Sequence, residues 1–290
     1  MTSPFREIVR GLGLSESSKV AILRVYGDAG GNRDKSNLAL GAYVGTVQEW
    51  DSGFYPLWSD ELRAEGIECF HRNKMEWPFY GEFAEKGWNK EHQIAVLGRL
   101  HKIIRENTSG GCGQAVVNDP FNRLMPEAIQ KQYGGAYGWC VLRTIVWFGL
   151  FARQYDDWIH YFFEAGDHGQ GQINQAIKEL YDSPKYREMF RIASWTFASK
   201  KGPQGVVQLQ AGDFIGFEAY KAADNYVAGS PRKQRLSFDD LLRPPPQDLV
   251  MLWGEESITN WLAWLDECNG DVIESLIVKH SDVAPSLDQK

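Results

Sequence analysis

Asp213 lies in the middle of an apolar stretch that has the pattern of a helix, VQLQAGDFIGFEAYKA, residues 207–222. On a helical wheel its neighbours are mostly apolar, and the opposite side of the helix is apolar too. Most of this helix is therefore expected to be buried. A buried carboxylate without a partner costs several kcal/mol or stays protonated. An Arg or Lys side chain, a backbone hydrogen-bond network or a metal ion should neutralise it.

Two further acids end predicted strands, and a third follows in a loop. Asp28 ends the first strand, Glu164 ends an aromatic strand, and Asp167 comes shortly after it. Each alone is typical of a structural turn or a helix N-terminus. Together with Asp213 they suit one or two divalent cations, because Mg²⁺ and Mn²⁺ prefer carboxylate oxygens. Two such ions about 4 Å apart can activate a water and stabilise the leaving oxygen of a phosphodiester.

Basic residues and one histidine are candidates for substrate contacts. Lys200 and Lys201 follow a predicted strand and would bind phosphate, with an ordinary solvated loop as the alternative. His71 would contact substrate or shuttle a proton, with a structural histidine as the alternative. Three more candidates for phosphate contacts are Arg232, Lys233 and Arg235.

Charge and composition limit the classes of protein to consider. The 290 residues are 43% hydrophobic, which is enough to bury a sizeable core, and the net charge is −7. That charge gives no global attraction to nucleic acid or to an anionic membrane, so binding to nucleic acid needs a local basic patch.

The sequence predicts a cytoplasmic protein that does not bind a membrane. The N-terminus lacks the continuous apolar core of a signal peptide. The four cysteines are far apart and form no C-x-x-C pair, which favours reduced thiols. The most apolar run, WCVLRTIVWFGLFA, contains Arg143 and is shorter than the roughly 20 residues that span a bilayer. We expect it to form a buried helix.

Periodicity predicts a mixed α/β sheet covered by helices. Alternating apolar residues predict strands at 19–31, 37–47, 66–71, 113–120, 158–167 and 191–199. Apolar residues three and four apart predict helices at 89–106, with Asn89 as N-cap, and at 137–154, 171–184, 207–222 and 255–267.

Several of these segments carry motifs of a known family. The first strand ends YGDAGG, a later element reads CFHRNKME, a tryptophan-led helix begins GWNKEH, and the apolar helix reads LQAGDFIGFEAYK. In this order the chain resembles, over roughly Val20–Tyr226, the bacterial and phage proteins of domain of unknown function 3800, which are grouped with the ribonuclease H-like fold.

The resemblance implies a ribonuclease H-like domain at 1–243 with helical insertions, followed by a C-terminal helical extension at 244–290 packed on the same domain. That fold places acids on its first strand, near a later central strand and on a C-terminal helix. These positions correspond to Asp28, to Glu164 ahead of Asp167, and to Asp213. The resemblance thereby implies a nuclease that uses Mg²⁺ or Mn²⁺.

One departure from the family supports a second hypothesis. The family has a glutamate where this sequence has Ala29, so one carboxylate that would bind metal or position water is absent. The alternative function is a catalytically inactive module that binds nucleic acid or protein. The tryptophan-bearing helix, 253–264, would then dock a protein partner or a second copy of the chain, or it simply packs on its own domain.

Overall fold

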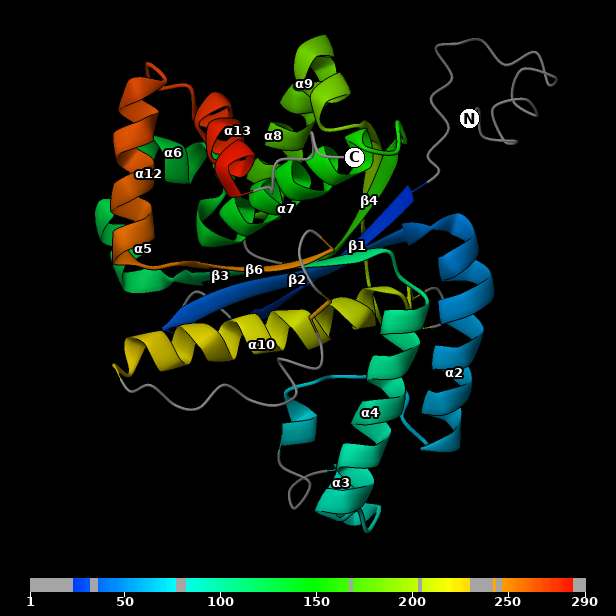
Figure 1. Ribbon diagram of the computed structural model, residues 1–290. Coiled ribbons are helices and arrows are strands. Elements are labelled where there is room, and N and C mark those ends of the chain that lie inside the picture. Colours follow the sequence, from blue (N-terminus) through cyan, green and yellow to red (C-terminus); the bar gives the residue numbers. More distant parts are fainter. Residues whose placement is uncertain are drawn as a thin grey trace, which may run out of the picture.

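In the part of the chain that the structure describes, one β-sheet with helices on both faces forms the centre (Figure 1). The computed structural model describes residues 23–31, 36–76, 82–166, 169–202, 205–229, 242–243 and 247–283. The predicted α/β class is confirmed, since the sheet is six-stranded, mixed in direction and flanked by helices.

The sheet combines an antiparallel meander with parallel strands on either side. Its order is β5-β4-β1-β2-β3-β6. β1 to β3 are antiparallel neighbours, β4 runs parallel to β1, β5 parallel to β4, and β6 parallel to β3. The bounds are β1 (Leu23–Gly31), β2 (Asn37–Thr46), β3 (Gly110–Val117), β4 (Ile159–Glu164), β5 (Ile192–Ala198) and β6 (Asp248–Trp253).

One face of the sheet is covered by the apolar helix α7 (Gly135–Arg153) and its neighbours. Alternate side chains of the strands, such as Val25 in β1 and Tyr161 in β4, pack against this helix in one core cluster. The other helices on this side are α5 (Asn118–Leu124), α6 (Glu127–Tyr133), α8 (Gln170–Asp182), α9 (Pro184–Met189), α12 (Glu255–Glu267) and α13 (Val272–Val283).

The opposite face is covered by α10 (Leu209–Val227), which lies along the sheet (Figure 1). Tyr26 of β1 and Phe162 of β4 pack in a second cluster on this side, together with Phe214 of α10. The remaining elements are η1 (Glu49–Phe54), α2 (Tyr55–Ala64), η2 (Lys74–Glu76), α3 (Glu82–Glu85) and α4 (Lys90–Glu106). α4 begins as predicted, because the Asn89 side chain accepts a hydrogen bond from the backbone N–H of His92 at 2.8 Å.

Glycines let α10 approach the sheet backbone closely. A Cβ atom added to Gly41 of β2 would lie 2.1 Å from the carbonyl oxygen of Gly212 and 2.2 Å from the nitrogen of Gly216. A Cβ atom on Gly212 would lie 2.9 Å from the backbone nitrogen of Asp28. No side chain fits at these positions unless the helix moves, so the glycines fix the distance between α10 and β1.

The C-terminal segment 244–290 adds a strand as well as helices. β6 pairs with the edge of β3, and the sequence pattern did not predict it. In α12 the Trp261 side chain is buried, stacks edge-on against Trp139 with ring centroids 4.6 Å apart, and donates to the hydroxyl of Ser275 at 3.0 Å. At least this tryptophan packs on its own chain, and the docking of a partner by α12 stays a prediction.

The predicted strand at 66–71 is wrong. These residues form a turn and a loop after α2, and Gly66 has a φ of 62°, which ends the preceding helix. The backbone N–H of Phe70 donates to a side chain of α10, Gln210, at 3.0 Å instead of to a neighbouring strand. The prediction also missed α2 and α13, where helical segments were not recognised.

α7 is long and apolar enough, by length and composition alone, to cross a membrane, but most of it is buried inside the protein. Arg143 in its middle is fully buried. Its guanidinium carbon lies 4.7 Å from the centre of the Trp253 ring, and one nitrogen contacts the sulfur of Met251 at 3.6 Å. No described residue hydrogen-bonds to its other two nitrogens, and burial lowers the pKa of Arg143 to about 9.

Gly212→Ala tests the close contact between helix and sheet. We expect a loss of about 1–3 kcal/mol in the free energy of unfolding, because the new methyl group overlaps the backbone of β2. Gly98→Ala in α4 is the matched control, since nothing lies within 4 Å of the added carbon. Alanine should there stabilise the helix by about 0.5–1 kcal/mol. Urea unfolding measures both, and equal effects of the two changes would contradict the role of Gly212.

Arg143→Met tests whether the buried guanidinium destabilises the fold. We expect a gain of about 1–3 kcal/mol in unfolding free energy, because the variant no longer buries an unneutralised charge. Arg153→Met on the exposed end of the same helix should change it by less than about 0.5 kcal/mol. A loss of stability in Arg143→Met would contradict this expectation and indicate that the stacking of the guanidinium on Trp253 stabilises the fold.

Candidate functional site

Asp28 and Glu164 come to the same face of the sheet through strand alternation. Asp28 is two residues beyond Tyr26 in β1, and Glu164 is two beyond Phe162 in β4, so both acids lie on the α10 side. β1 and β4 are parallel neighbours, which brings both acids to the same end of the sheet. Asp28 is only 1% exposed.

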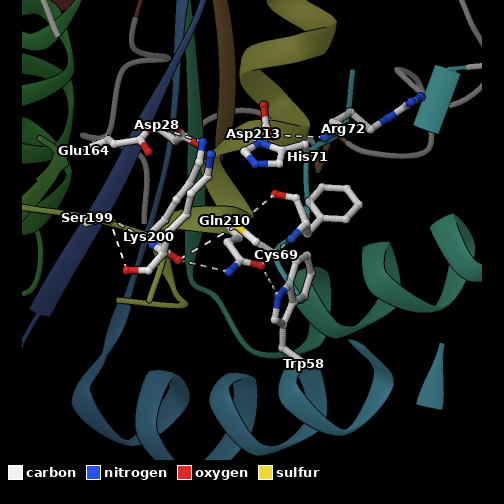
Figure 2. Close-up of polar contacts among 12 residues, drawn as sticks. Asp28, Trp58, Cys69, His71, Arg72, Glu164, Ser199, Lys200, Gln210 and Asp213 are labelled. Carbon is white, nitrogen blue, oxygen red and sulfur yellow. Dashed lines mark hydrogen bonds and ion pairs between the residues drawn. The ribbon is translucent and has the colours of Figure 1, made fainter. Parts of the chain in front are cut away.

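The Lys200 side chain reaches into this acidic pair from the loop after β5. Its Nζ donates to Asp28 Oδ2 at 2.6 Å and lies 3.0 Å from Glu164 Oε2 (Figure 2). The side chain is 6% exposed, so the ammonium is almost removed from water. The sequence pointed to Lys200 as a phosphate contact, whereas in the structure its ammonium is bound by two carboxylates.

Asp213 joins the cluster from α10 and anchors the loop before η2. Its Oδ2 accepts a hydrogen bond from the backbone N–H of Arg72 at 2.9 Å. The Nδ1 atom of His71 lies 3.8 Å from the same oxygen. A backbone N–H donor and the nearby charge of Lys200 therefore offset the cost of burying most of the Asp213 carboxylate.

The three carboxyl groups outnumber the single ammonium of Lys200, and their pKa values are shifted in opposite directions. Burial raises the pKa of Asp28 well above its usual range, and a hydrogen bond with Glu164 and the charge of Asp213 raise it further. Burial also raises the pKa of Asp213. For Glu164, burial is outweighed by the hydrogen bond with Asp28 and by the ammonium, so its pKa is lowered. Any proton that the pair takes up therefore binds Asp28 in preference to Glu164.

Lys200 itself stays charged. Burial disfavours its charged form, but the carboxylates of Asp28, Asp213 and Glu164 together raise its pKa above the usual value. Asp28 Oδ1 is buried and receives no N–H or O–H donor from the described residues. The contact of Asp28 with Glu164 forms only while one of the two is protonated, so an ionised Asp28 has one oxygen without a partner.

His71 is neutral at pH 7. Burial is the main cause that lowers its pKa to about 4, and the positive charges of Lys200, Lys201 and Lys74 add to the effect. Its contact with Asp213 is therefore no ion pair at neutral pH. A neutral imidazole near a carboxylate can accept a proton or donate an oriented N–H.

Gln210 fixes the loops that carry the functional residues, and the sequence pattern did not predict this role. Its Oε1 accepts hydrogen bonds from the backbone N–H of Phe70 at 3.0 Å and from Trp58 Nε1 at 3.2 Å (Figure 2). Its Nε2 donates to the carbonyl oxygen of Lys200 at 3.4 Å. The available signal was a polar residue three positions before Asp213 on an otherwise apolar helix.

Other predicted site residues lie beside the cluster or outside the described residues. Lys201 is exposed, and its backbone N–H donates a hydrogen bond to the hydroxyl of Ser199 at 3.1 Å. Asp167, predicted as a fourth metal ligand, lies outside the described residues, as do Arg232, Lys233 and Arg235.

The carboxyl oxygens of the cluster suit a divalent cation in their chemistry, but the position of Lys200 restricts where an ion can bind. Hard carboxyl oxygens, the excess of three carboxyl groups over one ammonium and the unpartnered Asp28 Oδ1 all favour a cation. Within the described part of the chain, no three His, Cys, Asp or Glu side chains are spaced to hold a metal ion. The Lys200 ammonium occupies the space between Asp28 and Glu164. An ion must therefore use other oxygens of the cluster, or Lys200 must move.

Comparisons with known proteins do not indicate what this site does. No family model matches the chain, and no curated protein matches its sequence. The resemblance of the motifs to domain of unknown function 3800 stays a prediction.

His71→Asn tests the lowered pKa in metal-free buffer with a chelator. In the unfolded chain the histidine takes up a proton near pH 6.5, but the folded protein resists it down to about pH 4. The wild type should therefore lose about 1–2 kcal/mol relative to the variant as the pH falls from 6.5 to 4, after allowance for partial exposure. Thermal unfolding of both proteins across this range measures the difference, and parallel stability curves would contradict the assignment.

Proposed function

We propose that this protein is a metal-dependent phosphodiester hydrolase in which Asp28, Glu164 and Asp213 bind Mg²⁺ or Mn²⁺. The observation that carries the proposal is the meeting of these three acids, from β1, β4 and α10, at one end of the sheet. Strand alternation and the glycine contact of α10 bring them together, although they are far apart in the sequence. A cluster with this excess of carboxylate is well suited to a divalent cation.

The arrangement supports a ribonuclease H-like assignment. An acid on the first strand, an acid on a strand beside it in the middle of the sheet, and an acid on a later helix are the placements that this fold implies. Asp28, Glu164 and Asp213 occupy these places in that order. The assignment rests on fold analogy, so the chemistry has to be argued from the site itself.

The cluster offers three functions that hydrolysis of a phosphodiester needs. A bound divalent ion supplies an activated water and stabilises the leaving oxygen. The neutral imidazole of His71, close to Asp213, is able to take a proton from that water. Lys201 is exposed next to the cluster and places a positive charge where a phosphate would approach.

A non-catalytic binding module is the second candidate. Two observations favour it: Ala29 stands where the resembling family has a glutamate, and the Lys200 ammonium already pairs with two of the acids. In that case the acids and the lysine form a structural ion-pair network, and the stability of the protein does not depend on divalent cations.

Metal titration with acid variants separates the two candidates. We expect Mn²⁺ to stabilise the wild type by about 2.7 kcal/mol when the free ion is about 100 times its Kd. Asp28→Asn and Asp213→Asn should lose this stabilisation, and both should lose hydrolysis of single- or double-stranded substrates by about a hundredfold or more. The measurements are thermal unfolding with and without Mn²⁺ and a cleavage assay on DNA and RNA.

Asp182→Asn is the matched control, because this acid is exposed on α8 and pairs only with a lysine of its own helix in the described contacts. It should retain both the metal effect and the activity. A wild type that shows no change in melting temperature with Mn²⁺ and no cleavage would contradict the hydrolase and favour the binding module.

A further inference from the structure

We propose that Lys200 is a permanent second cation of the site, so that the protein binds one divalent ion and not two. This inference rests on the proposed function, because it describes how the same carboxylates would hold metal. Three observations support it: the position of the Lys200 ammonium, the carboxylate oxygens that do not contact it, and the charge of the cluster.

The position of Lys200 is built into the fold. The carbonyl oxygen of Lys200 accepts a hydrogen bond from the buried Gln210, and the carbonyl of the preceding Ser199 accepts one from the N–H of Val206 at 2.8 Å. These bonds fix the loop on both sides of the lysine. The side chain then runs inward to Asp28 with almost no exposure to solvent. Withdrawal of the ammonium would leave the buried carboxylate of Asp28 facing the partly buried carboxylate of Glu164, which is costly.

Lys200 contacts only two of the carboxylate oxygens of the three acids. It binds Oδ2 of Asp28 and Oε2 of Glu164. Oδ1 of Asp28 is buried and lacks a donor, and the described hydrogen bond to Asp213 reaches Oδ2 alone. Asp213 directly follows Gly212, which packs against Asp28, since a Cβ atom added to Gly212 would lie 3.1 Å from the Cβ atom of Asp28. The remaining oxygens of Asp28 and Asp213 are suited to one further cation.

The charge of the cluster also favours the binding of one divalent ion. When fully ionised, Asp28, Glu164 and Asp213 carry three negative charges. The ammonium and one divalent ion carry one and two positive charges, which balance them. Two divalent ions with the ammonium would carry five positive charges and leave an excess of two in a buried place, which is unfavourable without further anions.

Mn²⁺ stoichiometry tests the inference directly. The full chain is freed of metal and titrated with Mn²⁺, free ion is measured by electron paramagnetic resonance, and bound ion by equilibrium dialysis. We expect one ion per chain in the wild type and no signal from a spin-coupled pair. Lys200→Met should bind two ions, because the second cation position is then vacant. Lys200→Arg keeps the positive charge and should still bind one.

Lys178→Met serves as the control for loss of a lysine, since Lys178 is exposed on α8 and pairs with Asp182. It should bind one ion. Two ions in the wild type would overturn the inference while leaving the proposed function intact, and this result needs no variant to fold. One ion in both the wild type and Lys200→Met, with at least tenfold tighter binding in the variant, would also overturn it, because Lys200 would then be a competitor displaced by metal. Absence of Mn²⁺ binding in every protein would overturn the proposed function itself, and the inference with it.

Discussion

The close contact between α10 and the backbone of β1 and β2 is the constraint on which the candidate site depends. Gly41, Gly212 and Gly216 have no side chains, and the modest space between helix and sheet admits none. Because the helix lies directly on the strands, Asp213 comes next to Asp28 instead of a side-chain layer away. The same proximity buries Asp28 fully and most of the Asp213 side chain, and burial is the first cause that raises the pKa of each.

A network of polar contacts offsets the free-energy cost of burying the acids. Lys200 provides the charge, the backbone N–H of Arg72 provides a donor, and Gln210 holds the two loops that carry them. Such a network is favourable only when nearly every polar group is satisfied. The unpartnered Asp28 Oδ1 shows that the described residues do not complete it. In a structural ion-pair network this atom is a cost, whereas in a cation site it is a ligand.

The two faces of the sheet have different properties. The α7 face is built from aliphatic and aromatic side chains, and its main irregularity is Arg143, which stacks on Trp253 without a described anionic partner. On the α10 face, aromatic packing stops where the strands reach Asp28 and Glu164, and a charged cluster begins. The α7 face therefore contributes mainly apolar packing, whereas the candidate site lies at one end of the opposite face.

Local patterns in the sequence determined the strands that carry Asp28 and Glu164, the helix that carries Asp213, and the cap of α4 at Asn89, because alternation, helical periodicity and capping involve residues close together in the chain. Those patterns also marked the three acids as candidates. They did not reveal that Lys200 binds Asp28, a contact between residues 172 positions apart. Nor did they reveal that the backbone N–H of Phe70, within the segment predicted as a strand, donates to the side chain of Gln210. Only the tertiary structure decided these partners. The packing of α10 on the sheet brings particular loops next to the buried charge, and the spacing of residues along the chain does not tell which loops these are.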